Sequence, residues 1–183
     1  MLPNMTVLAP GDAEEARKAV VAAAKTDGPV YLRFGRAPTP VFTTPETPFS
    51  IGKALTLWSS ENPKVAILST GSLSYAALVA ARSLAASGIG SLVLHVPTIK
   101  PLDEETVLGA AKQTGRVITI EEHQAAGGLG STIAEFLSEH HPVPLRRLGV
   151  QDMFGQSGTP LELLAHYGLD APHLEAAVRA FIS

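Results

Sequence analysis

The chain has 183 residues, of which 45% are apolar and 17% charged, with a formal net charge of −3 and no cysteine. This composition excludes a disordered chain, a disulfide framework, a thiolate nucleophile and cysteine-ligated metal sites. With 14 basic against 17 acidic residues, it indicates binding to neither nucleic acid nor an anionic membrane. No apolar run reaches the roughly 18–20 residues of a membrane span. We therefore expect a soluble, globular, cytoplasmic protein.

The first 36 residues predict a single βαβ unit. Apolar runs at 6–9 and 30–34 predict two strands, and the segment between them predicts a helix. Asp12 is a favourable N-cap for that helix, and Glu15 completes a capping-box-like pair. A two-stranded parallel sheet needs cover on both faces, which so short a segment cannot supply. We therefore expect residues 1–36 to be the C-terminal remnant of a domain whose body lies before Met1.

The segment 37–48 is rich in proline and threonine, with four residues of each type. Proline fixes φ and disfavours helix, so this composition predicts an extended, semi-rigid linker between two domains. The alternative is an ordinary surface loop.

From residue 49 to 183 the pattern is that of an α/β domain. Strands predicted at 53–58, 65–69, 91–96, 116–121 and 144–150 alternate with predicted helices. Asp103, Thr159 and Asp170 are predicted N-caps, with a capping-box Glu162 after Thr159. This alternation predicts a mostly parallel sheet joined by right-handed crossovers.

A Gly-Gly-Leu-Gly run at 127–130 follows a predicted strand and opens a helix, where backbone amides can bind a phosphate. However, Ile133 stands where the dinucleotide-binding fingerprint needs its third glycine, and the charges of Glu121 and Glu122 would repel a phosphate. We therefore favour a hinge at which strand and helix pack closely over a nucleotide site.

Two further clusters lie at predicted strand ends. Thr-Gly-Ser at 70–72 lies at an edge where open α/β sheets bind ligands, although Gly-Ser also serves as a turn and cap. Glu121 and His123 would share one face of an extended strand and could perform acid–base chemistry. The alternative for Glu121-Glu122-His123 is a polar loop or an interface contact. The six histidines contain no i, i+4 pair, so we expect no metal site.

Two arginines, Arg33 and Arg36, lie at and just beyond the end of the second predicted strand. An arginine in such a loop can bind a phosphate or carboxylate bidentately. The alternative is an ordinary surface salt bridge.

The order of the motifs resembles the transketolase family over essentially the whole chain. Residues 1–36 resemble the end of its pyrimidine-binding domain, and 49–183 resemble the transketolase C-terminal domain, with 37–48 as the linker. The matching motifs are Leu-Pro-Asn-Met-Thr-Val at 2–7, Pro-Gly-Asp at 10–12, Gly-Pro-Val-Tyr-Leu-Arg-Phe-Gly-Arg at 28–36, Ile-Gly-Lys-Ala at 51–54, Ala-Ile-Leu-Ser-Thr-Gly at 66–71, Pro-Thr-Ile-Lys-Pro-Leu-Asp at 97–103, Glu-Glu-His at 121–123, Gly-Gly-Leu-Gly at 127–130, Gly-Thr-Pro at 158–160 and Tyr-Gly-Leu at 167–169. The resemblance implies a three-layer α/β/α sandwich with a mostly parallel five-stranded sheet, in which the strand at 53–58 is antiparallel.

The resemblance also implies a function. Members of the family transfer a two-carbon ketol unit between sugar phosphates, using thiamine diphosphate and magnesium held by a Gly-Asp-Gly motif and a catalytic glutamate in earlier domains. This chain has no Gly-Asp-Gly. It is therefore expected to bind no cofactor or metal, to carry no catalytic residue and to be inactive alone.

Arg36 matches the family arginine that contacts the sugar-phosphate substrate. The implied partners are an N-terminal transketolase section, or missing N-terminal domains, and further copies in a homo-oligomer such as a dimer. Alternatives are a fragment of a 2-oxo acid dehydrogenase beta chain, a deoxyxylulose-phosphate synthase, a non-catalytic assembly module and a small-ligand sensor.

Overall fold

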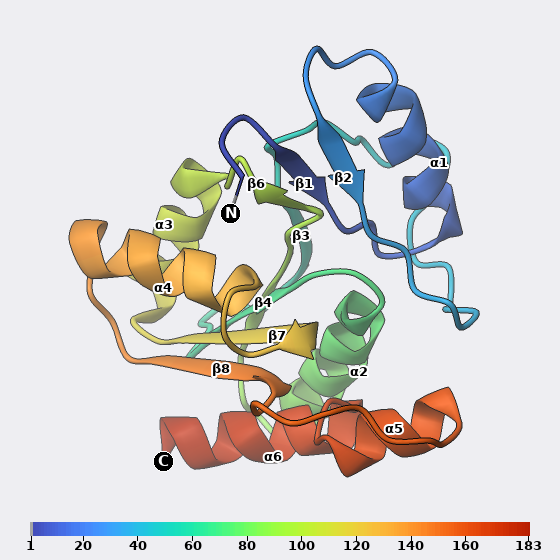
Figure 1. Ribbon diagram of the computed structural model, residues 1–183. Helices are drawn as coiled ribbons and strands as arrows, with labels where there is room; N and C mark the ends of the chain where they lie inside the picture. Colours follow the sequence, from blue (N-terminus) through green and yellow to red (C-terminus); the bar gives the residue numbers. More distant parts are fainter. Residues whose placement is uncertain (1) are drawn as a thin grey trace.

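The computed structural model describes residues 2–183, which form two sheets and six helices within that range (Figure 1). The strand orders are β2-β1-β6 and β3-β5-β4-β7-β8. Within residues 2–183, none of the helices has the length and apolar character that a transmembrane helix requires. The elements in chain order are β1 Thr6–Leu8, α1 Ala13–Ala23, β2 Val30–Leu32, β3 Leu55–Ser59, β4 Ala66–Ser69, α2 Leu73–Ala86, β5 Leu92–His95, β6 Thr98–Lys100, α3 Glu104–Thr114, β7 Val117–Gln124, α4 Leu129–His140, β8 Leu145–Val150, α5 Pro160–His166 and α6 Ala171–Ile182.

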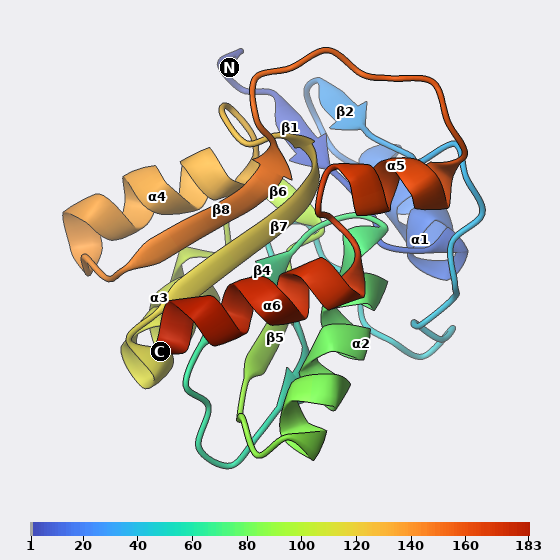
Figure 2. The same ribbon diagram turned by 90° about the horizontal axis from the view of Figure 1, so that it is seen from below.

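The five-stranded sheet is the centre of a three-layer sandwich. Strands β5, β4, β7 and β8 are parallel, and β3 pairs antiparallel with β5 at one edge. Helices α2 and α6 cover one face, and α3 and α4 cover the other (Figures 1 and 2). The predicted sandwich, including its single antiparallel strand, is confirmed.

The buried strand β4 shows why its sequence is apolar throughout. Ile67 packs in the cluster under α2 and α6, whereas Ala66 and Leu68 pack in the cluster under α3 and α4. A parallel strand covered on both faces reads as a continuous apolar run rather than as an alternating one.

The three-stranded sheet joins both parts of the chain. Strands β1 and β2 are parallel, which confirms the predicted βαβ unit. Strand β6, which the sequence analysis missed, pairs antiparallel with β1 and places Thr98 opposite Leu8. Three residues between Pro97 and Pro101 read as a loop, since each proline removes a backbone donor. Residues 98–100 therefore complete the sheet of the N-terminal unit.

The predicted helix starts are present. Residues 37–48 form neither helix nor strand, and Thr159 N–H donates to Glu162 Oε2 at 3.0 Å, as in a capping box. The other three caps are aspartates whose carboxylates accept a backbone N–H in the first turn: Asp12 from Glu15, Asp103 from Thr106 and Asp170 from His173.

Candidate functional site

The carboxyl ends of strands from both sheets meet at one junction. The carbonyl of Ala9, directly after β1, accepts hydrogen bonds from Gly71 N–H at 3.1 Å and from the Thr70 hydroxyl at 3.4 Å, both directly after β4. Arg33, directly after β2, donates from Nη2 to the carbonyl oxygen of Glu122 in β7 at 2.6 Å. Because α/β sheets bind ligands at the carboxyl ends of their strands, this junction is the candidate functional site.

The two predicted arginines differ in their surroundings. The guanidinium of Arg33 is held by Glu122, and its backbone N–H donates to the carbonyl of Leu8 at 2.8 Å. Arg36 is exposed, and the hydrogen bonds and ion pairs found among residues 2–183 include none from its guanidinium. Arg33 is therefore a structural link between the sheets, whereas Arg36 is available for an anion.

The Glu121-Glu122-His123 cluster is used within the fold. Glu122 accepts a hydrogen bond from the Ser72 hydroxyl at 3.1 Å, so the predicted Thr-Gly-Ser turn is tied to β7. The Nδ1 atom of exposed His123 lies 4.0 Å from Glu121 Oε2, so these side chains share a face as expected. Because Glu121 is only 2% exposed and already bonded, the pair does not present two free acid–base groups.

Glu121 fills the N-terminus of α4. Its Oε2 accepts Leu129 N–H and its Oε1 accepts Gly130 N–H, each at 2.8 Å. A Cβ atom on Gly128 would lie only 1.9 Å from Glu121 Oε2, which confirms the predicted close packing of strand and helix. The helix end that could cradle a diphosphate thus already holds a carboxylate, and it does not fit the phosphates of a cofactor. Residues 2–183 also contain no group of three or more acidic or histidine side chains that could hold a metal ion.

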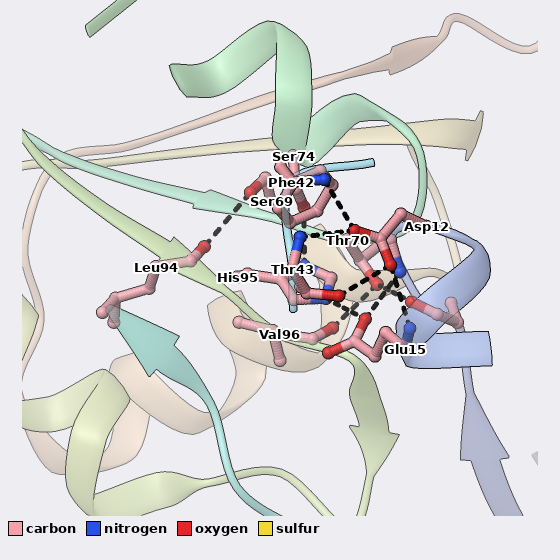
Figure 3. Close-up of polar contacts among 12 residues, drawn as sticks. Asp12, Glu15, Phe42, Thr43, Ser69, Thr70, Ser74, Leu94, His95 and Val96 are labelled. Atoms are coloured by element: carbon pink, nitrogen blue, oxygen red, sulfur yellow. Dashed lines mark hydrogen bonds and ion pairs between the residues drawn. The ribbon is translucent and has the colours of Figure 1, made fainter. Parts of the chain in front are cut away.

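A buried polar network lies beneath this junction (Figure 3). His95, at the end of β5, contacts Glu15 Oε2 through Nε2 and the Ser74 hydroxyl through Nδ1, each at 2.6 Å. Glu15 Oε2 also accepts Gly11 N–H at 2.6 Å. Because a carboxylate only accepts, Nε2 carries the hydrogen, and Nδ1 of the neutral ring accepts from Ser74.

The sequence analysis missed this network. It assigned Glu15 to capping alone, but the residue is 3% exposed and bonded to a partner 80 positions later in the chain. The one available signal was His95 itself, which ends an otherwise apolar strand and, when buried, requires hydrogen-bond partners.

Asp12 extends the network to the segment after Arg36. Its Oδ2 accepts the N–H groups of Phe42 at 2.8 Å and Thr43 at 2.6 Å, and its Oδ1 accepts the Thr43 hydroxyl at 2.8 Å (Figure 3). Burial alone would raise the pKa of Asp12, but these hydrogen bonds and the one from Glu15 N–H outweigh it and hold the pKa below the usual range. Asp12 is therefore both a helix cap and a link to a segment 30 residues away.

Residues 52–174 match the family described as transketolase, C-terminal domain. The chain belongs to the transketolase family. A related protein is the 6-deoxy-6-sulfo-D-fructose transketolase subunit SqwH of Clostridium sp. (strain MSTE9), which is 45% identical over 176 residues, 96% of this chain and 54% of the relative. A second is 1-deoxy-D-xylulose-5-phosphate synthase 1 of Geobacter metallireducens (strain ATCC 53774 / DSM 7210 / GS-15), which is 39% identical over 185 residues, 99% of this chain and 29% of the relative.

A solved structure described as "Split gene transketolase, inactive beta4 tetramer" has a TM-score of 0.94 and 43% identity, covering all of this chain and 59% of the other. The chain thus spans 54% and 59% of the two split transketolase polypeptides compared here. The predicted resemblance to a transketolase C-terminal section is confirmed.

Proposed function

We propose that the chain is the C-terminal section of a thiamine-diphosphate-dependent transketolase that transfers a two-carbon ketol unit between sugar phosphates. The observation that carries this proposal is the exposed guanidinium of Arg36 at the junction of the two sheets. A guanidinium can bind phosphate oxygens bidentately, which fixes the orientation of the substrate as well as its affinity. The transketolase subunit among the relatives supports this assignment.

We place the sites for thiamine diphosphate and magnesium outside this chain. When bound, thiamine diphosphate supplies the covalent chemistry of the transfer. The carboxylate of Glu121 at the N-terminus of α4 supports a cofactor site elsewhere. The contribution of this chain would then be to bind and orient the substrate phosphate through Arg36 and to support the assembly. Alone it would be inactive.

The proposed partners are an N-terminal transketolase section and further copies of this chain. Val20, Tyr31 and Phe34 in the N-terminal unit are about half exposed, which supports a covering partner there. The tetrameric relative supports a homo-oligomer, and a dimer of complete active units is our expectation. The boundaries 1–36, 37–48 and 49–183 and the cytoplasmic location stay predictions.

A deoxyxylulose-phosphate synthase is the second candidate, because a synthase of that name is 39% identical to this chain. It shares the phosphate-binding role proposed for Arg36, so the two candidates differ in their donor and acceptor substrates. A 2-oxo acid dehydrogenase beta chain and a non-catalytic assembly module remain alternatives that the experiment below separates.

The test is Arg36→Ala in the chain assembled with its N-terminal section. Loss of a charge-assisted bidentate contact worth about 2–3 kcal/mol should raise KM for phosphorylated substrates about 30- to 150-fold. KM for an acceptor without phosphate should stay unchanged. Arg82→Ala, at an exposed arginine of α2, is the matched control and should behave as the parent.

Two results would contradict the proposal. An unchanged KM of the Arg36→Ala enzyme for every phosphorylated substrate would remove the role of Arg36. Ketol transfer by the 183-residue chain alone would contradict the need for an N-terminal section, and an assembled enzyme without any transferase activity would favour the assembly module.

A further inference from the structure

The anchoring of Asp12 exceeds what a helix cap requires. A cap needs one acceptor for the first turn, which the Glu15 N–H bond already satisfies. The other three hydrogen bonds of this carboxylate all go to Phe42 and Thr43. Asp12 is 4% exposed, so all four bonds are shielded from water.

The chain between Arg36 and this anchor is short and stiff. Only residues 37–41 separate Arg36 from Phe42, and two of them, Pro38 and Pro40, have φ fixed by the ring. The residues before each proline are also restricted to extended conformations. A displacement at Phe42 would therefore be transmitted to Arg36 rather than absorbed between them.

The chain is also anchored on the other side of Arg36. Arg33 is held to Leu8 through its backbone N–H and to Glu122 through its guanidinium. Arg36 thus lies between one anchor three residues before it and another six residues after it. Only the second anchor depends on a single side chain outside the segment, namely Asp12.

The base of the second anchor is itself fixed. The neighbouring Glu15 binds His95 in β5, which holds the start of α1 against the five-stranded sheet. A Cβ atom on Gly11 would lie 2.4 Å from Phe42 Cζ, so the ring of Phe42 packs directly on the backbone that precedes Asp12 (Figure 3). The position of Phe42 is therefore set relative to the sheet whose edge forms the site.

We propose that Asp12 is a positioning residue for Arg36: it fixes the segment 37–43 so that the Arg36 guanidinium is presented to a phosphate group of the substrate. This inference rests on the proposed function of Arg36. Asp12 contacts no substrate itself, and its effect passes through the backbone of residues 37–43.

The test compares Asp12→Asn with Asp103→Asn in the enzyme assembled with its N-terminal section. Asp103 is a matched control because it is also an N-cap aspartate, is also 4% exposed and bonds a distant backbone N–H, that of Ala54. An amide at position 12 cannot accept from both Phe42 and Thr43 as the carboxylate does. We expect Asp12→Asn to raise KM for phosphorylated substrates about tenfold with little change in kcat, and Asp103→Asn to leave KM unchanged.

A second measurement does not depend on activity. Amide hydrogen exchange of the 183-residue chain should show loss of protection at Phe42 and Thr43 in Asp12→Asn but not in Asp103→Asn. If Asp12→Asn fails to fold, Thr43→Val removes one bond of the same anchor and should give a smaller change in the same direction in both measurements.

The outcomes separate the two proposals. In the Arg36→Ala background, Asp12→Asn should have no further effect on KM, because Asp12 acts only through Arg36. If Arg36→Ala raises KM while Asp12→Asn does not, the positioning role is overturned and the proposed function stands. If Arg36→Ala itself leaves KM unchanged, both are overturned.

Discussion

Gly128 provides the sharpest test of the packing at the N-terminus of α4. Its backbone is extended, with φ −106° and ψ −150°, so no conformational reason requires glycine there. What excludes a side chain is Glu121, because a new Cβ would lie 1.9 Å from Oε2 and 2.7 Å from Cδ. Gly128→Ala must therefore displace a carboxylate that is held by two backbone N–H groups.

The size of the effect follows from those two bonds. Each net hydrogen bond to a charged group contributes about 1.5–3 kcal/mol, so their partial loss should lower the free energy of unfolding by about 3 kcal/mol in Gly128→Ala. Glu121→Ala loses both bonds and should cost about 4 kcal/mol. In the Glu121→Ala background, Gly128→Ala should cost only the about 1 kcal/mol of a poorer N-cap. The double variant should thus be about 2 kcal/mol more stable than additivity predicts.

The assay is urea unfolding of the 183-residue chain, followed by circular dichroism and by the fluorescence of its one tryptophan, Trp58. Gly109→Ala is the control: it lies inside α3, a Cβ there meets nothing within 4 Å, and the substitution should stabilise by about 0.5–1 kcal/mol. Additive costs of Gly128→Ala and Glu121→Ala would refute the reasoning, because the carboxylate would then not be what requires a glycine.

Two further predictions concern the buried polar groups. Hydrogen bonds hold the pKa of Asp12 and Asp103 below the unfolded value of 3.8 despite burial; each carboxylate therefore stabilises the fold above that value, and its contribution is lost as the pH falls through the folded pKa. Asp12→Asn and Asp103→Asn should each flatten the acid-side fall in unfolding free energy, measured by urea titrations at a series of pH values, and a parent-like slope in both would contradict this linkage. His95→Phe leaves Glu15 and Ser74 buried without the imidazole and should cost about 3 kcal/mol, much of which His95→Phe with Glu15→Leu should recover; a double variant no more stable than the single one would show that the buried carboxylate is not the source of the cost.

The parts of the fold that the sequence predicted are those with a strong local signal. The continuous apolar run of β4 and the Asp-initiated helices needed only neighbouring residues to be recognised. Strand β6 has three residues between two prolines, and it exists only because β1 lies beside it. No local pattern reports a pairing between positions 7 and 100, so this strand was out of reach.

The site shows the same division. Glu121 was recognised as unfavourable for a phosphate, yet its bonds to Leu129 and Gly130 depend on how α4 turns back on β7. The partnership of Glu15 with His95 joins residues 80 positions apart and has no periodic signature. The role of Arg36 came from the resemblance to transketolases, and the structure adds its exposure and the two anchors beside it.

One physical device recurs at three helices and explains why Arg36 stands apart. The N-terminal N–H groups of α1, α3 and α4 are each met by a carboxylate, from Asp12, Asp103 and Glu121 respectively. These helix ends would otherwise be the natural anion sites of an α/β fold. With them occupied by the protein's own carboxylates, and with Arg33 bound to Glu122, a substrate phosphate reaching this edge meets the guanidinium of Arg36. Selectivity for the phosphate would then depend on one cation held in place by its neighbours, which is why we expect a single substitution at Arg36 or Asp12 to be visible in KM.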